Sequence, residues 1–238
     1  MHDGDFPDWE QVLSAAAHLQ QVLPGSVLVG GTAAAFYAGH RFSCDADHVV
    51  VSLRDRFNAV LADLEQVAGW NTARRQRPVL ILGNLDGIDT GVRQLRRQEP
   101  LETQEVEIGG ESLVLPTPEE MLRIKAALIL SRNATRDYLD FVALQDHLGH
   151  ERAARALRDL DRLYPQPDDQ SALQQLYAQL AQPLPYDLEE VNLSEYKGLR
   201  PPWNDWAYIH ARCVEVSLDL FDALEEDDDS QGPSLGSG

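Results

Sequence analysis

The sequence predicts an α+β fold, in which a mixed sheet flanked by helices is followed by a helical C-terminal half. The first observation is the order of the predicted elements: short apolar strands alternate with helices, two β-hairpins follow, and only helices come after Pro116. The second is composition, because 43% of the 238 residues are hydrophobic, as is usual for globular domains. We therefore expect an α/β core over residues 1–115, a helical domain over 116–226 and a disordered tail over 227–238.

The elements of the first half follow from apolar spacing and from the residues that end helices. An amphipathic pattern predicts a helix before Pro24-Gly25, and a second helix ends at Gly69, since Gly favours helix C-termini. Short apolar runs bounded by turn residues predict strands. The predicted elements are, in order, a helix over 8–22, a strand over 26–29, a helix over 31–38, a strand over 45–52 and a helix over 54–68.

Two β-hairpins come next, and helices follow them. An Asp-Gly pair in a loop of about five residues marks the first hairpin, and Gly109-Gly110 marks the turn of the second. Thr117 as N-cap, with Glu120 three residues later, forms a capping box that begins the helical half. Strands are thus predicted over 78–82, 88–95, 105–108 and 111–115, and helices over 118–131, 134–148, 151–163, 170–181 and 205–224.

Composition excludes several classes of partner. The net charge of −19 argues against non-specific binding to nucleic acid, because phosphate neutralisation requires lysine and arginine. No apolar run reaches the roughly 18 residues of a membrane span, and the acidic N-terminus does not resemble a signal peptide. Two cysteines far apart in the sequence favour a reducing compartment over a disulfide framework. We therefore expect a cytoplasmic protein with no membrane partner.

Asp45 and Asp47 are the strongest functional signal in the chain, and they lie at the start of a predicted strand. Side chains alternate along a strand, so the two carboxylates point to one face, about 7 Å apart at their Cα atoms. Such a pair suits Mg²⁺, a hard cation that takes oxygen ligands and shares them with substrate phosphates. Upstream, Gly30-Gly31-Thr32 forms a turn at a predicted helix N-terminus, where backbone amides can hold phosphate.

A two-metal site for phosphoryl transfer needs a third carboxylate. Asp89, in the strand after the first hairpin turn, is the preferred candidate. Asp86 is its competitor, but a place beside Gly87 explains Asp86 as a turn residue. His48 follows Asp47 and leaves three interpretations open: a neighbour of the metal site, a partner for Asp89, or a half-buried strand residue.

Lys125 lies among apolar residues on a predicted helix, and it is the only lysine before Lys197. An unpaired buried charge is costly, so a nucleotide triphosphate or an acidic cluster is expected beside Lys125. Alternatively, the side chain extends its ammonium to the edge of the helix. Asp137 and Asp140 share one face of the next helix at i, i+3.

These motifs resemble the DNA polymerase β-like nucleotidyltransferase superfamily, whose motif I is a Gly-Gly or Gly-Ser turn followed by Asp-x-Asp. The segment 39–47 resembles the form found in the AbiEii/AbiGii-type toxin family. Lys125, Arg132 and the segment 136–140 match further motifs of that family in order. Thr32 stands where the superfamily usually has Ser, and the hydroxyl is retained. The resemblance implies the polymerase β-like nucleotidyltransferase fold for the mixed sheet.

The resemblance also implies an activity and a site. The enzyme would move an NMP from an NTP to an acceptor hydroxyl, on a tRNA end or a protein, and would act as a toxin with a cognate antitoxin or in phage defence. The implied ligands of Mg²⁺, or of Mn²⁺, are Asp45, Asp47 and Asp89. Lys125 and Asp137 are the further implied catalytic residues. The implied nucleotide-binding residues are Gly30, Gly31, Thr32, Arg41, Ser43 and Lys125.

Two alternatives stay open for the function. The first is a binding module that keeps the nucleotidyltransferase fold but has lost catalysis. Against it stands the completeness of the site, since the glycine turn, the three carboxylates and the lysine are all present. The second is a metal-dependent hydrolase that uses Asp45, Asp47 and His48, which would need further ligands at metal-binding spacing.

Overall fold

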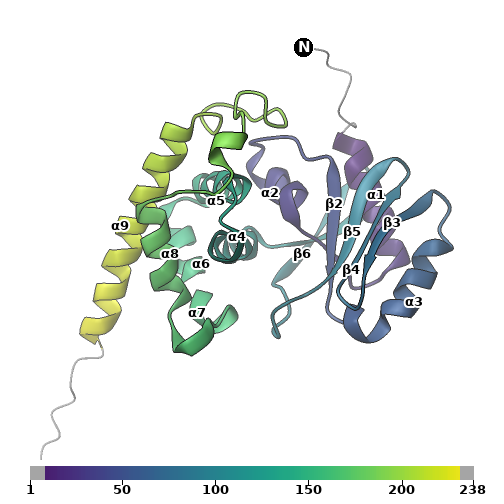
Figure 1. Cartoon of the computed structure of the whole chain (residues 1–238), viewed down its shortest axis with the longest axis horizontal. Helices are drawn as coiled ribbons and strands as arrows, with labels where there is room; N and C mark the ends of the chain where they lie inside the picture. Colours follow the sequence, from purple (N-terminus) through teal and green to yellow (C-terminus); the bar gives the residue numbers. More distant parts are fainter. Residues whose placement is uncertain (1–8, 231–238) are drawn as a thin grey trace, which may run out of the picture. The chain divides into compact units, whose positions relative to one another are not determined.

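The computed structural model describes residues 9–230, with side chains through residue 219 (Figure 1). The chain divides into two compact units. The first unit contains Met1–Met121 together with Lys197–Arg200, and the second contains Leu122–Tyr196 and Pro201–Gly238. The segment Lys197–Arg200 thus belongs to the first unit although the residues on both sides of it belong to the second.

A five-stranded mixed sheet forms the centre of the first unit. Its order is β1-β2-β5-β4-β3, and only β2 and β5 are parallel to each other. This mixed sheet and the helices beside it confirm the predicted α+β class. The strand bounds are β1 Val27–Leu28, β2 Asp45–Val50, β3 Trp70–Gln76, β4 Leu80–Leu85 and β5 Ile88–Gln94.

One face of this sheet carries the hydrophobic core. Helices α1 (Trp9–Val22) and α3 (Leu53–Glu65) pack there, and the core cluster contains residues of both helices together with Ile81, Leu85 and Val92 of the sheet. The apolar residues of α3 recur at helical spacing, which is why this helix presents one apolar side to the sheet. The positions that alternate with the core residues therefore lie on the opposite face of the strands.

Two further elements complete the first unit. Helix α2 (Gly30–Ala38) begins directly after β1 and packs against β2. Strands β6 (Thr103–Ile108) and β7 (Glu111–Pro116) form a separate two-stranded sheet around Gly109-Gly110, as the sequence predicts. Helix α4 (Pro118–Arg132) follows, and the Thr117 hydroxyl accepts a hydrogen bond from the Glu120 amide at 3.2 Å, which confirms the predicted N-cap.

The second unit is helical within the residues described. A partly buried set of hydrogen bonds joins α5 to the start of α9, because the Asp146 carboxylate accepts hydrogen bonds from Trp203, Tyr208 and Arg212. The α-helices after α4 are α5 Thr135–Leu148, α6 His150–Leu157, α7 Leu160–Leu163, α8 Ala172–Ala181 and α9 Trp206–Ser230. Short 3₁₀ turns occur at Pro167–Asp169 and Leu188–Glu190.

The structure corrects several predicted elements. Strand β3 was not predicted, because it is a polar edge strand whose residues after Thr72 are exposed, and no apolar alternation marks it. The predicted loop 83–87 is a two-residue turn at Asp86-Gly87, so β4 extends to Leu85. The predicted helix 151–163 is divided into α6 and α7. Helix α9 continues into the predicted tail as far as Ser230, and residues 231–238 lie outside those described.

Candidate functional site

Three carboxylates lie on the sheet face that α1 and α3 do not cover. Asp45 and Asp47 are partly exposed and alternate with buried residues along β2. In the parallel pairing of β2 with β5, Asp45 lies directly opposite Asp89. The sheet register thus brings together the three aspartates that the sequence predicts for one site.

Gly91 leaves room for the carboxylate of Asp47. It lies opposite Asp47 in the register of β2 and β5. A Cβ atom at position 91 would lie 2.5 Å from Asp47 Oδ1 and 2.9 Å from the Leu82 side chain. Any residue larger than glycine would therefore displace the Asp47 carboxylate or the Leu82 side chain.

Each of the three carboxylates has its own polar partner. Lys197 Nζ lies 3.2 Å from Asp45 Oδ1. Arg93 lies 3.5 Å from Asp47 Oδ1. The Asn84 amide donates to Asp89 Oδ1 at 3.1 Å. Two cations therefore sit beside two of the three carboxylates.

The three carboxylates are chemically suitable ligands for Mg²⁺, but their side chains are not arranged around one point. Carboxylate oxygens are the ligands that Mg²⁺ prefers, and Gly91 keeps space beside Asp47. Among the described residues, however, no group of three or more His, Cys, Asp or Glu side chains is arranged to hold a metal ion. The backbone positions suit such a site, while the side chains turn toward their separate partners.

The glycine turn and the loop before β2 form a buried support for this face. The Thr32 hydroxyl donates to the backbone carbonyl of Asp45. The backbone of Gly31 lies against the Arg41 guanidinium and the Ser43 hydroxyl. Thr32, Arg41 and Ser43 are all buried, and Arg41 also donates to the Phe42 carbonyl at 3.1 Å. These predicted nucleotide-binding side chains thus hold the backbone that presents Asp45.

His48 belongs to the core and not to the carboxylate face. It alternates with Asp47 and is fully buried on the side of α1. Its Nδ1 lies 3.0 Å from the Ala46 carbonyl oxygen, and burial lowers its pKa to about 4. The structure therefore excludes the roles beside the metal site and beside Asp89, and it corrects the half-buried interpretation to full burial. The hydrolase ligand set of Asp45, Asp47 and His48 does not form.

Asp86 is a turn residue, as its position beside Gly87 indicates. Both residues have positive φ angles, +53° and +89°, and they connect β4 to β5. The Asp86 carboxylate lies 3.4 Å from the His18 ring nitrogen Nδ1.

Lys125 forms a buried ion cluster in the second unit. Its ammonium lies 2.6 Å from Asp140 Oδ2 and 3.5 Å from Asp137 Oδ1. Arg132 donates to both oxygens of Asp137, at 2.9 and 3.1 Å. Lys125, Asp137 and Asp140 are almost fully buried. The partner of Lys125 is therefore an acidic cluster, and the ammonium does not extend to the helix edge.

Three residues of the carboxylate face were not assigned to it from the sequence: Asn84, Arg93 and Lys197. Period-two counting along β5 could have found Arg93, since it lies four residues after Asp89 and thus on the same face. Lys197 had a compositional signal, because the chain contains only two lysines. Its position, 152 residues after Asp45, could not be read from spacing.

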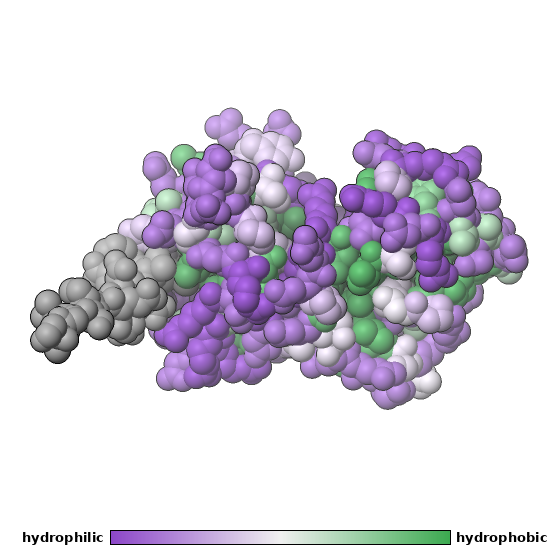
Figure 2. All heavy atoms as spheres, turned by 90° about the horizontal axis from the view of Figure 1, so that it is seen from below, coloured by the Kyte–Doolittle hydropathy of each residue, from purple (hydrophilic) through white to green (hydrophobic). Residues whose placement is uncertain are grey.

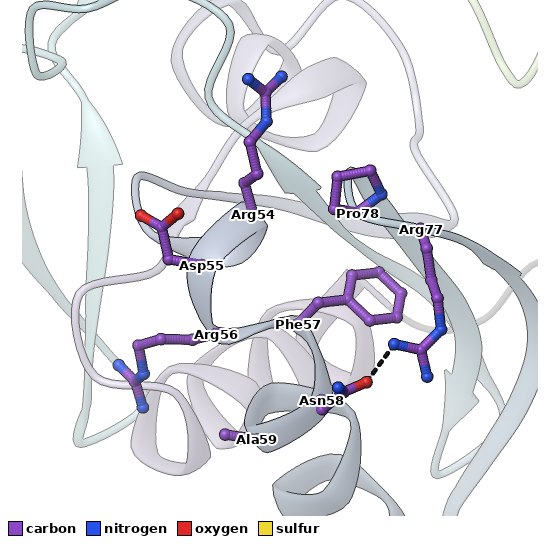
Figure 3. A pocket seen from close by; sticks show the side chains of 8 residues that line it. All are labelled: Arg54, Asp55, Arg56, Phe57, Asn58, Ala59, Arg77 and Pro78. Atoms are coloured by element: carbon purple, nitrogen blue, oxygen red, sulfur yellow. Dashed lines mark hydrogen bonds between the residues drawn. The ribbon is translucent and has the colours of Figure 1, made fainter.

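An open pocket of about 460 Å³ lies elsewhere in the first unit (Figure 3). It is formed by the start of α3 and the turn between β3 and β4, and Arg54, Arg56 and Arg77 are among its lining residues. Arg77 donates to Asn58 and lies 4.9 Å above the Phe57 ring. Arg54 follows the end of β2, whereas Asp45 and Asp47 lie at the start of β2 and Asp89 lies opposite Asp45. The pocket is therefore separate from the candidate site.

The surface seen in Figure 2 is largely hydrophilic, with smaller apolar areas between the polar side chains. Within residues 9–230, no helix combines the length and the apolar character needed to cross a membrane.

Comparison with known proteins gives relatives that are much longer than this chain. No protein-family model matches the chain. It is 30% identical over 234 residues to the heme uptake protein MmpL11 of Mycobacterium tuberculosis, across 90% of this chain and 23% of that protein. It is 33% identical over 137 residues to the mycolic acid-containing lipids exporter MmpL11 of Mycolicibacterium smegmatis, across 56% of this chain and 14% of that protein. The chain thus spans less than a quarter of the curated relatives that it matches.

Solved structures resemble the chain over most of its length. JHP933 from Helicobacter pylori aligns with a TM-score of 0.55 at 17% identity, across 93% of this chain and 94% of that chain. An antigenic nucleotidyltransferase-like protein from Paracoccidioides brasiliensis aligns with a TM-score of 0.46 at 20% identity, across 70% of this chain and 92% of that chain. The likeness to JHP933 shows a shared fold alone. The sheet topology confirms the predicted α+β class, a mixed sheet flanked by helices and followed by a helical C-terminal half.

Proposed function

We propose that this protein is a nucleotidyltransferase that moves an NMP from an NTP to an acceptor hydroxyl. The observation that carries the proposal is the pairing of Asp45 with Asp89 across parallel strands, with Asp47 on the same face. Nucleotidyl transfer needs positioning and charge neutralisation more than covalent help from the protein. This sheet face supplies carboxylates for a metal and cations for phosphate groups.

The proposed roles of residues in the first unit are supported by their positions. Asp45, Asp47 and Asp89 would hold Mg²⁺ or Mn²⁺, which when bound neutralises phosphate charge. The amides of Gly30 and Gly31 begin α2, whose positive N-terminal end favours phosphate beside Asp47.

The remaining predicted site residues have supporting parts in this proposal. Arg41, Ser43 and Thr32 would support the glycine turn from their buried positions. The catalytic parts of Lys125 and Asp137 rest on the sequence resemblance.

The acceptor and the biological role are also part of the proposal. A tRNA end or a protein hydroxyl as acceptor, and action as a toxin with a cognate antitoxin or in phage defence, rest on the resemblance to the AbiEii/AbiGii-type family. Reaction in the cytoplasm, where NTPs and Mg²⁺ are present, agrees with the two free cysteines. Heme uptake and lipid export are functions given in the names of full-length relatives, and this chain matches 23% or less of each. We propose neither function for this chain.

A specific observation also favours a second candidate, a binding module without catalysis. Lys197 and Arg93 occupy positions beside Asp45 and Asp47, and the carboxylates do not form a three-ligand group among the described residues. A protein that binds a nucleotide or a partner without reacting would show the same arrangement.

Transfer of label from NTPs tests the proposal directly. Each of the four NTPs, labelled at the α-phosphate, is incubated with the protein and Mg²⁺ or Mn²⁺, with total RNA and with total protein as acceptors. The variant Asp47→Asn removes a metal ligand and keeps the side-chain volume. Asp86→Asn is the matched control, because it removes a carboxylate from the turn and Asn tolerates the positive φ there.

We expect label in one acceptor fraction for the wild type and for Asp86→Asn, and a loss of at least 100-fold for Asp47→Asn, as for groups that stabilise transition-state charge. Equal transfer by Asp47→Asn would refute the metal assignment. NTP binding without transfer to either fraction would favour the binding module. The absence of both would leave the sequence resemblance as the only link to nucleotidyltransferases.

A further inference from the structure

Lys197 reaches the carboxylate face from a distant part of the chain. Its ammonium lies 3.2 Å from Asp45 Oδ1, although 152 residues separate the two in sequence. The side chains of both residues are partly exposed, 34% for Lys197 and 49% for Asp45. A molecule that approaches Asp45 from solvent can therefore contact the ammonium as well.

The backbone holds this lysine in place. The Phe42 amide donates to the Lys197 carbonyl at 2.9 Å, and the Arg200 amide donates to the His40 carbonyl at 2.8 Å. These two hydrogen bonds attach the segment 197–200 to the loop that leads into Asp45. The segment accordingly belongs to the first unit, while the chain before and after it belongs to the second.

The conformation of this segment is specific. Lys197 and Gly198 both have positive φ angles, +43° and +61°. A Cβ atom at position 198 would lie 2.5 Å from the Phe42 ring, so only glycine permits this approach. A non-glycine residue in the left-handed region is strained, and such strain persists only where the surrounding structure holds the residue. The positive φ angle of Lys197 and the close approach of Gly198 to Phe42 thus fix the backbone at the residue that faces Asp45.

The contact with Asp45 does little for stability by itself. A partly exposed ion pair contributes little to the free energy of unfolding, because water and salt screen it. The two backbone hydrogen bonds and the Gly198–Phe42 contact attach the segment whatever residue stands at position 197. The side chain of Lys197 is therefore better explained by what binds at the carboxylate face than by folding.

We propose that Lys197 is a substrate-binding residue of this face, whose ammonium contacts the phosphates of a bound nucleotide. Asp45 holds the ammonium when no nucleotide is bound, which keeps the cation at the site and partly neutralises the carboxylate. The inference rests on the proposed function, because it takes an NTP as the ligand. An ammonium is a mobile point charge with three donors, and it suits phosphate oxygens in more than one position.

The test compares matched variants of the full chain by calorimetric titration with each NTP, with and without Mg²⁺. Lys197→Met removes the ammonium and keeps most of the side-chain volume. Arg200→Met is its control, since it removes one positive charge from the same segment, where the guanidinium lies 5.7 Å from the Phe42 ring centre. Lys197→Arg restores a cation, and Gly198→Ala keeps the lysine but displaces its backbone against Phe42.

We expect Lys197→Met to weaken NTP binding by about 10-fold or more, as for the loss of one hydrogen bond to a charged group. Arg200→Met should bind NTP within about 2-fold of the wild type, while Lys197→Arg should recover part of the loss. Gly198→Ala should weaken binding although the charge is unchanged. In the transfer assay, Lys197→Met should raise KM more than it lowers kcat.

The outcomes separate this inference from the proposed function. A wild type that binds no NTP overturns both. NTP binding by the wild type with equal affinity in Lys197→Met overturns the inference and leaves the proposed function standing. An equal loss in Lys197→Met and Arg200→Met also overturns it, because general charge would then explain the effect. A urea titration of each variant confirms that the losses do not come from unfolding.

Discussion

Replacing Lys125 by Met tests whether the buried ion cluster of the second unit is required for stability. The change removes an ammonium that is 2.6 Å from Asp140 and 3.5 Å from Asp137. Arg132 remains on Asp137, but the side chain of Asp140, which is 0% exposed, loses the ammonium that lies 2.6 Å from it. A buried carboxylate then has to ionise without that cation or take up a proton.

The expected cost follows from the burial of this group. Removing one partner of a buried ion pair destabilises proteins by about 3–5 kcal/mol, whereas exposed pairs contribute about 0–1 kcal/mol. Lys125→Met should therefore lower the free energy of unfolding by about 3 kcal/mol or more. The double variant Lys125→Met/Asp140→Leu should recover much of the loss, because replacing both charges by apolar groups removes the desolvation penalty.

Urea unfolding followed by circular dichroism measures these differences. With a slope near 3 kcal/mol per molar urea, a 3 kcal/mol loss moves the midpoint by about 1 M. Arg155→Met is the control, since the Arg155–Glu151 pair is largely exposed and 3.9 Å apart. If Lys125→Met destabilised the protein no more than Arg155→Met, the cluster would not carry the stability assigned to it here.

Two further predictions concern the effect of a side chain at position 91 and the reactivity of the two cysteine thiols. Gly91→Ala should cost only about 0.5–1.5 kcal/mol, because the atoms that its Cβ displaces are the ends of the Asp47 and Leu82 side chains. It should reduce nucleotide transfer, because the Cβ would lie 2.5 Å from Asp47 Oδ1. Urea unfolding and label transfer check this, and unchanged transfer would contradict it. Burial raises the pKa of the Cys213 thiol to about 12, so roughly one molecule in 10⁴ carries its thiolate at pH 8. Native protein should therefore react with a thiol reagent only at the partly buried Cys44, whereas unfolded protein should react at both cysteines. Rapid labelling of Cys213 in the native protein would disprove its burial.

Local patterns were sufficient where a rule depends on neighbouring residues alone. Strand alternation placed Asp45 and Asp47 on one face, and the capping residue Thr117 marked the start of α4. The turn residues at Gly109-Gly110 predicted the β6–β7 hairpin. Edge strand β3 escaped the same rules, because a polar strand exposed at a sheet edge has no apolar alternation to detect.

Which polar residues meet at the site depends on pairing between segments that are far apart in the sequence. The sequence named Asp89 as a candidate, but its position opposite Asp45 comes from the register of two parallel strands that a helix and a hairpin separate. His48 stands beside Asp47 in sequence, yet alternation and packing against α1 turn it into the core.

The sequence by itself determined the fold class, the order of most elements and the two aspartates that begin β2. Only the tertiary structure decided that Lys125 has Asp137 and Asp140 as partners, and that Lys197 lies against Asp45. The physical reason is range: alternation, helical periodicity and capping act within a few residues, whereas ion pairs and strand register depend on how distant segments pack.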